Sequence, residues 1–84
     1  MATKQHWYEI NLVTLSDIQH FVSLAEMLDM DLVLTDENGT YRVNAKSLLG
    51  VRYSCEWTSL YLISDEDVYM HFQDYIKASY IKTI

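Results

Sequence analysis

Apolar residues recur at three- and four-residue spacing between Ser16 and Asp29, and this repeat constrains the fold more than any other feature of the chain. Its members are Ile18, Phe21, Val22, Ala25 and Leu28. Such spacing predicts a helix with one apolar face, and Ser16 followed by Gln19 predicts a capping box at its start. Because the apolar face must be buried, other elements of this 84-residue chain have to cover it.

Four short segments with alternating or β-forming residues predict the strands of a covering sheet. They span residues 6–13, 32–34, 40–44 and 57–63. The Asn38-Gly39 pair between the second and third segments is a strong signal for a hairpin turn. We therefore expect these two strands to be antiparallel neighbours.

Two further helices are expected in the second half of the chain. Ser47 predicts the N-cap of a short helix over Leu48–Tyr53, and Ser64 with Asp67 predicts the capping-box-like start of a final helix that ends near residue 80. One face of that final helix is expected to comprise Val68, Phe72, Tyr75 and Ile76, with Ser79 as a further candidate.

The resulting order, β-α-β-β-α-β-α, predicts an α+β fold in a single domain over residues 1–84. Two amphipathic helices need one face of a sheet, which favours an open-faced sandwich: a four-stranded antiparallel sheet with helices packed on one face. The strands that flank each long helix are expected to be separated in the sheet, as in a split β-α-β arrangement.

Charge is unevenly distributed along the chain. The net charge is −6, and the segment between Gln5 and Tyr41 contains seven acidic residues and no Lys or Arg. Arg42, Lys46 and Arg52 lie in a stretch without acids. Because nucleic-acid binding needs clustered cations, nucleic acid is excluded as the main partner. The basic stretch is either a solvated face or a surface for a protein partner.

The single cysteine excludes an internal disulfide and suits a reducing compartment. We expect Cys55 to be a small hydrophobic residue rather than a reactive thiol. No segment approaches the ~18 apolar residues of a membrane span, and Met1–Ile10 lacks the apolar run of a signal peptide. The expected location is cytoplasmic, with no membrane partner.

Catalytic and metal sites have little support in the sequence. His6, His20 and His71 fall in different elements without a second ligand at metal spacing, so no metal or other cofactor is expected. Two acidic groups, Asp29 with Asp31 and Asp65 to Asp67, match a helix end and a helix start and are not expected to act as general acids or bases. Ser47 has no histidine near it in the sequence to activate it. The chain is therefore not expected to be an enzyme, whereas Tyr53, Trp57 and Tyr61 are candidates for an aromatic partner surface.

The segment YRVNAKSLLGV, Tyr41–Val51, resembles the bacterial phosphocarrier HPr and its relative Crh. A segment close to VN-[L/A]-KS-[I/L]-[M/L]-GV carries the kinase-modified serine of that family. The resemblance, which extends from about Ile18 to Ile76, implies the HPr-like open-faced sandwich and implies that Ser47 is a regulatory phosphorylation site. It also implies a partner-binding role for four neighbours of that serine: Lys46, Leu48, Leu49 and Arg52.

The phosphohistidine motif of that family is degenerate in this chain. Family members place glycine, an aliphatic residue, histidine, any residue, arginine and proline at the start of the first long helix. Here Thr14 stands near the histidine position, Ser16 at the arginine and Asp17 at the proline. Asp17 would repel a phosphohistidine, and the helical spacing directs His20 toward solvent, where it is expected to be a plain surface residue.

Together these observations predict a non-catalytic regulatory or binding module of the phosphotransferase-system type. Ser47 is either its phosphorylation switch or only a helix cap. The expected partner is an HPr-kinase-like enzyme or a transcriptional or metabolic regulator, and the oligomeric state stays open. One alternative is a phosphocarrier of the sugar phosphotransferase system with a non-standard acceptor. The other is a structural interaction protein that keeps only the fold.

Overall fold

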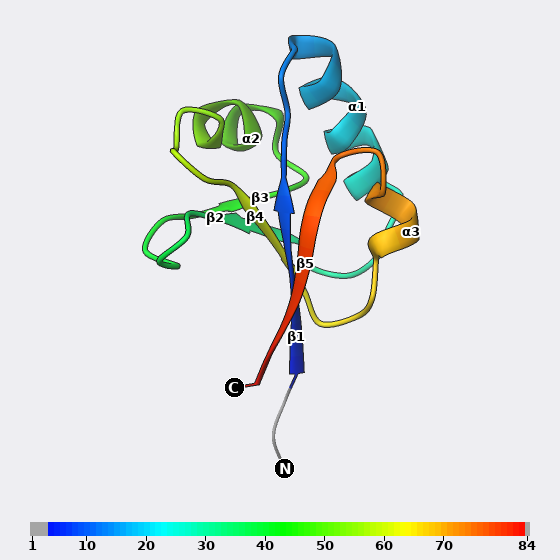
Figure 1. The fold of residues 1–84 in the computed structure, drawn as a ribbon. Helices are drawn as coiled ribbons and strands as arrows, with labels where there is room; N and C mark the ends of the chain where they lie inside the picture. The colour runs from blue at the N-terminus through cyan, green and yellow to red at the C-terminus, as the bar shows by residue number, and fades with distance from the viewer. Residues whose placement is uncertain (1–3, 84) are drawn as a thin grey trace.

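The computed structural model describes residues 4–83 and contains a five-stranded antiparallel sheet with three helices (Figure 1). The strands are β1 (Lys4–Ile10), β2 (Val33–Thr35), β3 (Arg42–Asn44), β4 (Tyr61–Ser64) and β5 (Ile76–Thr83). The helices are α1 (Leu15–Glu26), α2 (Leu48–Ser54) and α3 (Tyr69–Phe72). None of these helices is long and apolar enough to cross a membrane.

The core lies between one face of the sheet and the helices. Successive strand residues point to opposite faces, and Tyr8 and Leu62 are both buried on the face that meets the helices. Phe21 of α1, Val51 of α2 and Phe72 of α3 are fully buried in the same cluster. The rings of Phe21 and Phe72 lie 5.0 Å apart. The expectation that the helices cover one face of an antiparallel sheet is thereby confirmed.

The strand order is β3-β2-β4-β1-β5. Because β4 lies between β1 and β2, the two strands joined by α1 are not neighbours, which confirms the split β-α-β arrangement. The hairpin is also confirmed, since Leu34 of β2 is opposite Val43 of β3. At its turn Gly39 has a φ of 73°, a left-handed conformation that favours glycine.

The prediction of a long final helix is wrong, and the sheet has five strands rather than four. The helix α3 ends at Phe72, and residues 76–83 form β5, which pairs with β1 over its whole length. The positions Val68, Phe72 and Ile76 fit a four-residue spacing, but β1 has an open edge on this side. Hydrogen bonding of that edge by β5 outweighs the local helical pattern, because strand pairing satisfies the backbone groups of both segments.

Several boundaries also differ from the predicted ones. The first helix is capped by Thr14 with Asp17 rather than by Ser16 with Gln19, and it ends at Glu26. The first strand ends at Ile10. The fourth strand begins only at Tyr61, because the preceding residues 55–59 continue in turns after α2.

The predicted Ser64–Asp67 capping box does not form. The N-cap of α3 is Val68, which makes no side-chain cap hydrogen bond. Instead, the Ser64 hydroxyl oxygen accepts a hydrogen bond from the Glu66 N–H at 3.2 Å. The short α3 is anchored to the core by the fully buried Phe72.

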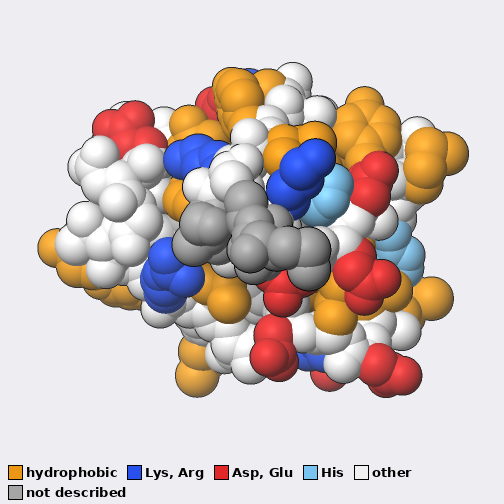
Figure 2. Space-filling model, turned by 90° about the horizontal axis from the view of Figure 1, so that it is seen from below, with side chains coloured by type: hydrophobic (Ala, Val, Ile, Leu, Met, Phe, Trp, Pro, Cys, Tyr) orange, Lys and Arg blue, Asp and Glu red, His pale blue; other side chains and the backbone are white. Residues whose placement is uncertain are grey.

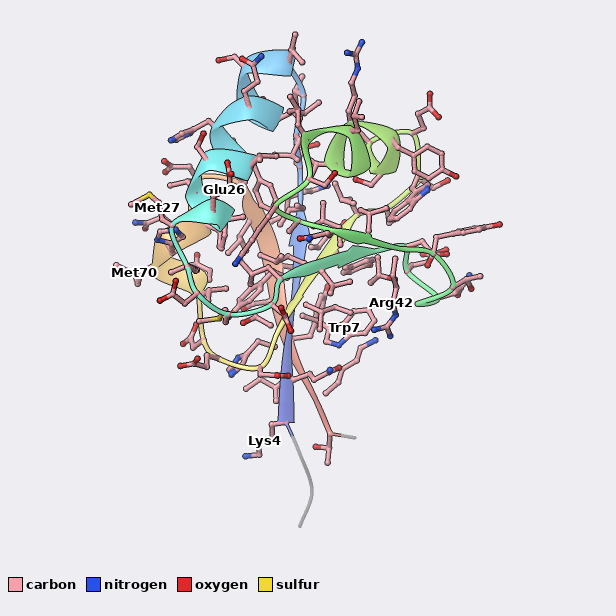
Figure 3. The ribbon with its side chains drawn as sticks, turned by 180° about the vertical axis from the view of Figure 1, so that it is seen from behind. Lys4, Trp7, Glu26, Met27, Arg42 and Met70 are labelled. Atoms are coloured by element: carbon pink, nitrogen blue, oxygen red, sulfur yellow. The ribbon has the colours of Figure 1, made fainter. Side chains whose placement is uncertain are left out.

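The face of the sheet opposite the helices carries a smaller aromatic cluster. Trp7 is buried there, with Tyr61 at 5.9 Å between ring centroids and the Lys82 ammonium 3.6 Å from the centre of its ring. Figure 3 shows Trp7 and Arg42 close together on this side. The tip of the β2–β3 hairpin at Gly39 lies over the same ring, so this face is only partly open.

Candidate functional site

The most prominent exposed apolar surface with adjacent positive charge lies on α2. We call it the α2 surface, and it comprises Tyr41, Leu48, Leu49, Arg52, Tyr53 and Trp57. Leu49 is 80% exposed and Tyr53 is 55% exposed. Because residues four apart share a helix face, Leu49 and Tyr53 present one continuous apolar stripe, with the exposed Arg52 beside them.

Two aromatic side chains, Tyr41 and Trp57, extend this stripe beyond the helix. The Trp57 ring lies 6.1 Å from the Tyr41 ring in a stacked arrangement and 6.0 Å from the Tyr53 ring in an edge-to-face arrangement. Tyr61, which the sequence grouped with Tyr53 and Trp57, packs against Trp7 on the outer face of the sheet instead. The aromatic part of the α2 surface is thus built from Tyr53 of α2 and from the segments that precede and follow the helix.

Ser47 is the N-cap residue of α2. Its side-chain oxygen accepts a hydrogen bond from the Gly50 N–H at 3.2 Å, and the residue is half-buried. The hydroxyl therefore stabilises the first turn of the helix. Leu48 and Arg52 are exposed next to it, so the structure brings Ser47 together with three of its four predicted partner-binding neighbours, Leu49 being the third.

Lys46 is the exception among those neighbours. Its ammonium donates a 2.6 Å hydrogen bond to the carbonyl oxygen of Leu28, just beyond the end of α1. A cation at this position satisfies a carbonyl group near a helix C-terminus and complements the helix dipole. The side chain thus ties the segment before α2 to α1 and does not extend toward the α2 surface.

The degenerate phosphohistidine site folds as an ordinary helix start. The Thr14 hydroxyl accepts a hydrogen bond from the Asp17 N–H at 3.0 Å, and the Asp17 carboxylate accepts hydrogen bonds from the N–H groups of Thr14 and Val13, each at 3.1 Å. These backbone hydrogen bonds hold the pKa of Asp17 below its ordinary value. Ser16 is exposed in the first turn. A negative charge of the chain itself therefore occupies the start of α1.

Each of the three histidines contacts a neighbouring aromatic ring. His20 is exposed, as expected, but its Nδ1 lies 2.6 Å from the Tyr75 hydroxyl. His71 donates from Nε2 to the Leu24 carbonyl oxygen at 2.6 Å, and His6 stacks on Tyr8. No group of three or more His, Cys, Asp or Glu side chains with metal-binding geometry occurs in residues 4–83.

Cys55, the single thiol, is half-buried at the end of α2 and packs against the core. Burial raises its pKa above the ordinary value. The neutral thiol is therefore favoured, and it is a poor nucleophile.

A polar cluster that the sequence did not indicate links β1 to the segment before α3. The Tyr8 hydroxyl donates to the Asp67 carboxylate at 3.0 Å and accepts from the Val68 N–H at 3.0 Å. Burial raises the pKa of Tyr8, whereas the hydrogen bond from the Tyr69 N–H lowers the pKa of Asp67. The phenol keeps its proton and the carboxylate keeps its charge, so the cluster favours hydrogen bonding over proton transfer.

This cluster borders a surface hollow of about 480 Å³ that His6, Tyr69 and Ile81 also line. The residues come from β1, β5, the β4–α3 connection and the start of α3, and β1 is far from the others in the sequence. The pairing of β1 with β5 and the hydrogen bonds of Tyr8 to Asp67 and Val68 bring them together, so no local spacing could have indicated the hollow.

Comparison with protein-family models, with curated proteins and with solved structures found no significant match to this chain. The resemblance of the Tyr41–Val51 segment to HPr therefore stays a prediction. The structure itself shows the α+β fold with an open antiparallel sheet.

Proposed function

We propose that this protein is a non-enzymatic, HPr-like regulatory module that binds a protein partner through the α2 surface. The observation that carries the proposal is the exposure of Leu49 beside Tyr53 and Arg52 on one helix face. Contiguous exposed apolar side chains of this kind mark interaction sites. Aromatic residues and arginine are also the residue types that contribute most to binding energy at protein interfaces.

The chemistry of the α2 surface defines the partner. Leu48, Leu49 and the rings of Tyr53 and Trp57 require an apolar counterpart, and Arg52 requires a carboxylate at its edge. The resemblance to HPr adds the class of partner: an HPr-kinase-like enzyme or a transcriptional or metabolic regulator. The free thiol of Cys55 is compatible with the cytoplasm as the compartment for such a partner.

Ser47 is the proposed switch of this surface. Transfer of a phosphoryl group from ATP to its side-chain oxygen would release ADP and the hydroxyl proton and would add about −1.5 to −2 charges. The phosphate would replace the hydroxyl that accepts from the Gly50 N–H, and it would lie beside Leu48 at the edge of the α2 surface. In the simpler form of the proposal, Ser47 only caps α2 and the surface binds without a switch.

Phosphorylation assays separate these functions. We would incubate the protein with ATP and an HPr kinase, and separately with phosphoenolpyruvate and Enzyme I, and locate any phosphate by intact mass and acid lability. The switch predicts one acid-stable phosphate that is lost in Ser47→Ala and retained in the control Ser16→Ala. Leu49→Ser should slow the kinase reaction, because it removes an exposed contact without altering the acceptor.

The other outcomes decide against parts of the proposal. An acid-labile phosphate from phosphoenolpyruvate would replace it with the phosphocarrier alternative. If no phosphate were found under either condition, Ser47 would not be a phosphorylation switch and would only cap α2. If an added HPr kinase or an HPr-binding regulator then also failed to shift the Leu49 methyl signals, the α2 surface would not be the docking site, and the structural interaction protein would be favoured.

A further inference from the structure

A second surface lies between the end of α1 and α3, on the opposite side of the helical layer from α2 (Figure 1). It is a groove of about 490 Å³, which we call the methionine groove. Its walls include Leu28, Met30, Glu66, Asp67, Met70 and His71. None of these residues belongs to the α2 surface, so the groove is a separate feature.

Two of the chain's four methionines, Met30 and Met70, line this groove, and Met27 precedes the lining residue Leu28. Met27 is 71% exposed and Met70 is 74% exposed, and Figure 3 shows both side chains on the same side of the molecule with Glu26 beside them. Met30 is half-buried in the wall, where its sulfur accepts a hydrogen bond from the Ser64 hydroxyl at 3.4 Å. Methionine side chains are flexible and polarisable, which suits them to surfaces that adapt to a partner.

The groove is bordered by carboxylates and by one histidine, His71. Glu66 and Asp67 line it, Glu26 adjoins Met27, and all three are exposed. The segments that form the groove contain no Lys or Arg, since none occurs between Gln5 and Tyr41 or between Tyr53 and Ile76. On the face shown in Figure 2, several acidic side chains lie near exposed hydrophobic ones.

One lysine and one further histidine reach this region from other elements. Lys46 donates to the Leu28 carbonyl oxygen and is half-buried. His6 faces Asp67 across the neighbouring hollow. Neither lines the groove. His71 does, but its Nε2 donates to the Leu24 carbonyl oxygen, so the carboxylates of Glu66 and Asp67 are the acidic groups beside the apolar lining residues.

We propose that the methionine groove docks a lysine-rich amphipathic helix of a partner protein. The apolar face of that helix would lie on Met27, Met70 and Leu28, and its lysines would meet Glu26 and Glu66. An amphipathic helix in an apolar groove is a recurrent mode of peptide recognition. A second copy of this chain is a poorer occupant, because a net charge of −6 on each copy opposes association. The proposal is independent of the α2 surface.

A synthetic peptide tests the proposal directly. The probe is a helix of about four turns that contains only leucine and lysine, with its leucines on one face. Binding would be followed on protein labelled with ¹³C at the methionine methyl groups. We expect the signals of Met27, Met30 and Met70 to shift together. The double variant Met27→Gln, Met70→Gln should weaken binding about tenfold, which corresponds to ~1.4 kcal/mol.

Two matched controls make the result specific. Leu49→Gln removes a comparably exposed apolar side chain from the α2 surface and should leave the affinity for the peptide unchanged. Peptides in which serine replaces leucine, or glutamate replaces lysine, should bind much more weakly. Circular dichroism of the methionine variant should match that of the parent protein, since both substituted side chains are largely exposed.

Four results would overturn the proposal. These are an absence of methionine shifts at saturating peptide, equal binding of the serine-substituted peptide, equal weakening by Leu49→Gln, and methionine shifts that depend on protein concentration without peptide. The second would show charge attraction alone, the third would move the site to the α2 surface, and the fourth would identify a second copy as the occupant.

Discussion

The hydroxyl of Tyr8 bridges Asp67 and the Val68 N–H, although Tyr8 lies near the start of the chain and the other two residues lie in its last quarter. Its oxygen is 3.0 Å from the Asp67 carboxylate and 3.0 Å from the Val68 nitrogen. Tyr8 is 2% exposed. One phenol therefore connects a central strand to the start of α3 and satisfies a buried backbone donor.

Replacement of Tyr8 by phenylalanine should lower the free energy of unfolding by about 1–3 kcal/mol, because the Val68 N–H is left without its acceptor in a buried position. Urea unfolding would measure the loss. Tyr80→Phe, at a residue that is 47% exposed, is the control and should change stability little. The pKa of Asp67 should also rise in Tyr8→Phe, since the Tyr8 hydrogen bond lowers it. Equal stabilities for the two variants would show that the bridge contributes nothing.

The Asp17 carboxylate should make stability depend on pH in the acidic range. Hydrogen bonds from the Thr14 and Val13 N–H groups lower its pKa in the folded state below the ordinary value of 3.8. A lowered pKa stabilises the fold above the unfolded-state value, and this contribution is lost as pH falls through the folded-state value. Asp17→Asn should therefore lose less stability than the parent protein between about pH 4 and pH 2. Parallel acid-unfolding curves for the two proteins would contradict this expectation.

Phe72 should contribute more stability than any other residue of α3. It is fully buried, and its ring lies 5.0 Å from that of Phe21. Phe72→Ala should cost about 3–5 kcal/mol because it opens a cavity in the core. Tyr69→Ala on the same helix is the control, since Tyr69 is 42% exposed. Thermal and urea unfolding would distinguish the two, and a small loss in Phe72→Ala would mean that α3 does not pack as described.

Gly39 should resist substitution at the hairpin turn. Its φ of 73° lies in the left-handed region, where a side chain other than that of glycine costs about 1–2 kcal/mol. Gly39→Ala should therefore lower the free energy of unfolding by that amount. Gly39→Asn should lower it less, since asparagine tolerates this conformation. Urea unfolding checks both variants, and equal losses would point to contact with Trp7 rather than backbone strain.

Local patterns predicted those parts of the fold whose hydrogen bonds and packing are near in sequence. The repeat from Ile18 to Leu28 indicated α1, because one helix face collects residues three and four apart. The Asn38-Gly39 pair indicated the β2–β3 hairpin, because its turn needs few residues. Ser47 was also identified as the cap of α2, since capping involves only the next three residues.

The candidate sites divide in the same way. Leu48, Leu49 and Arg52 are exposed on one short helix that the sequence predicted, whereas their partner-binding role was implied by the resemblance to HPr. The sequence did not show that Lys46 lies apart from these residues, because its hydrogen-bond partner is the Leu28 carbonyl group 18 positions away. The methionine groove was equally hidden, since it joins the end of α1 to α3.

The sequence alone determined that this protein is an α+β domain with helices over one face of an antiparallel sheet. Only the tertiary structure decided that Ile76–Thr83 is a strand and that Tyr8 meets Asp67. The physical reason is the separation in sequence over which each interaction acts. Side-chain periodicity and capping act within a few residues, whereas the open edge of β1 is completed by a segment about 70 positions later, whose own pattern also fits a helix.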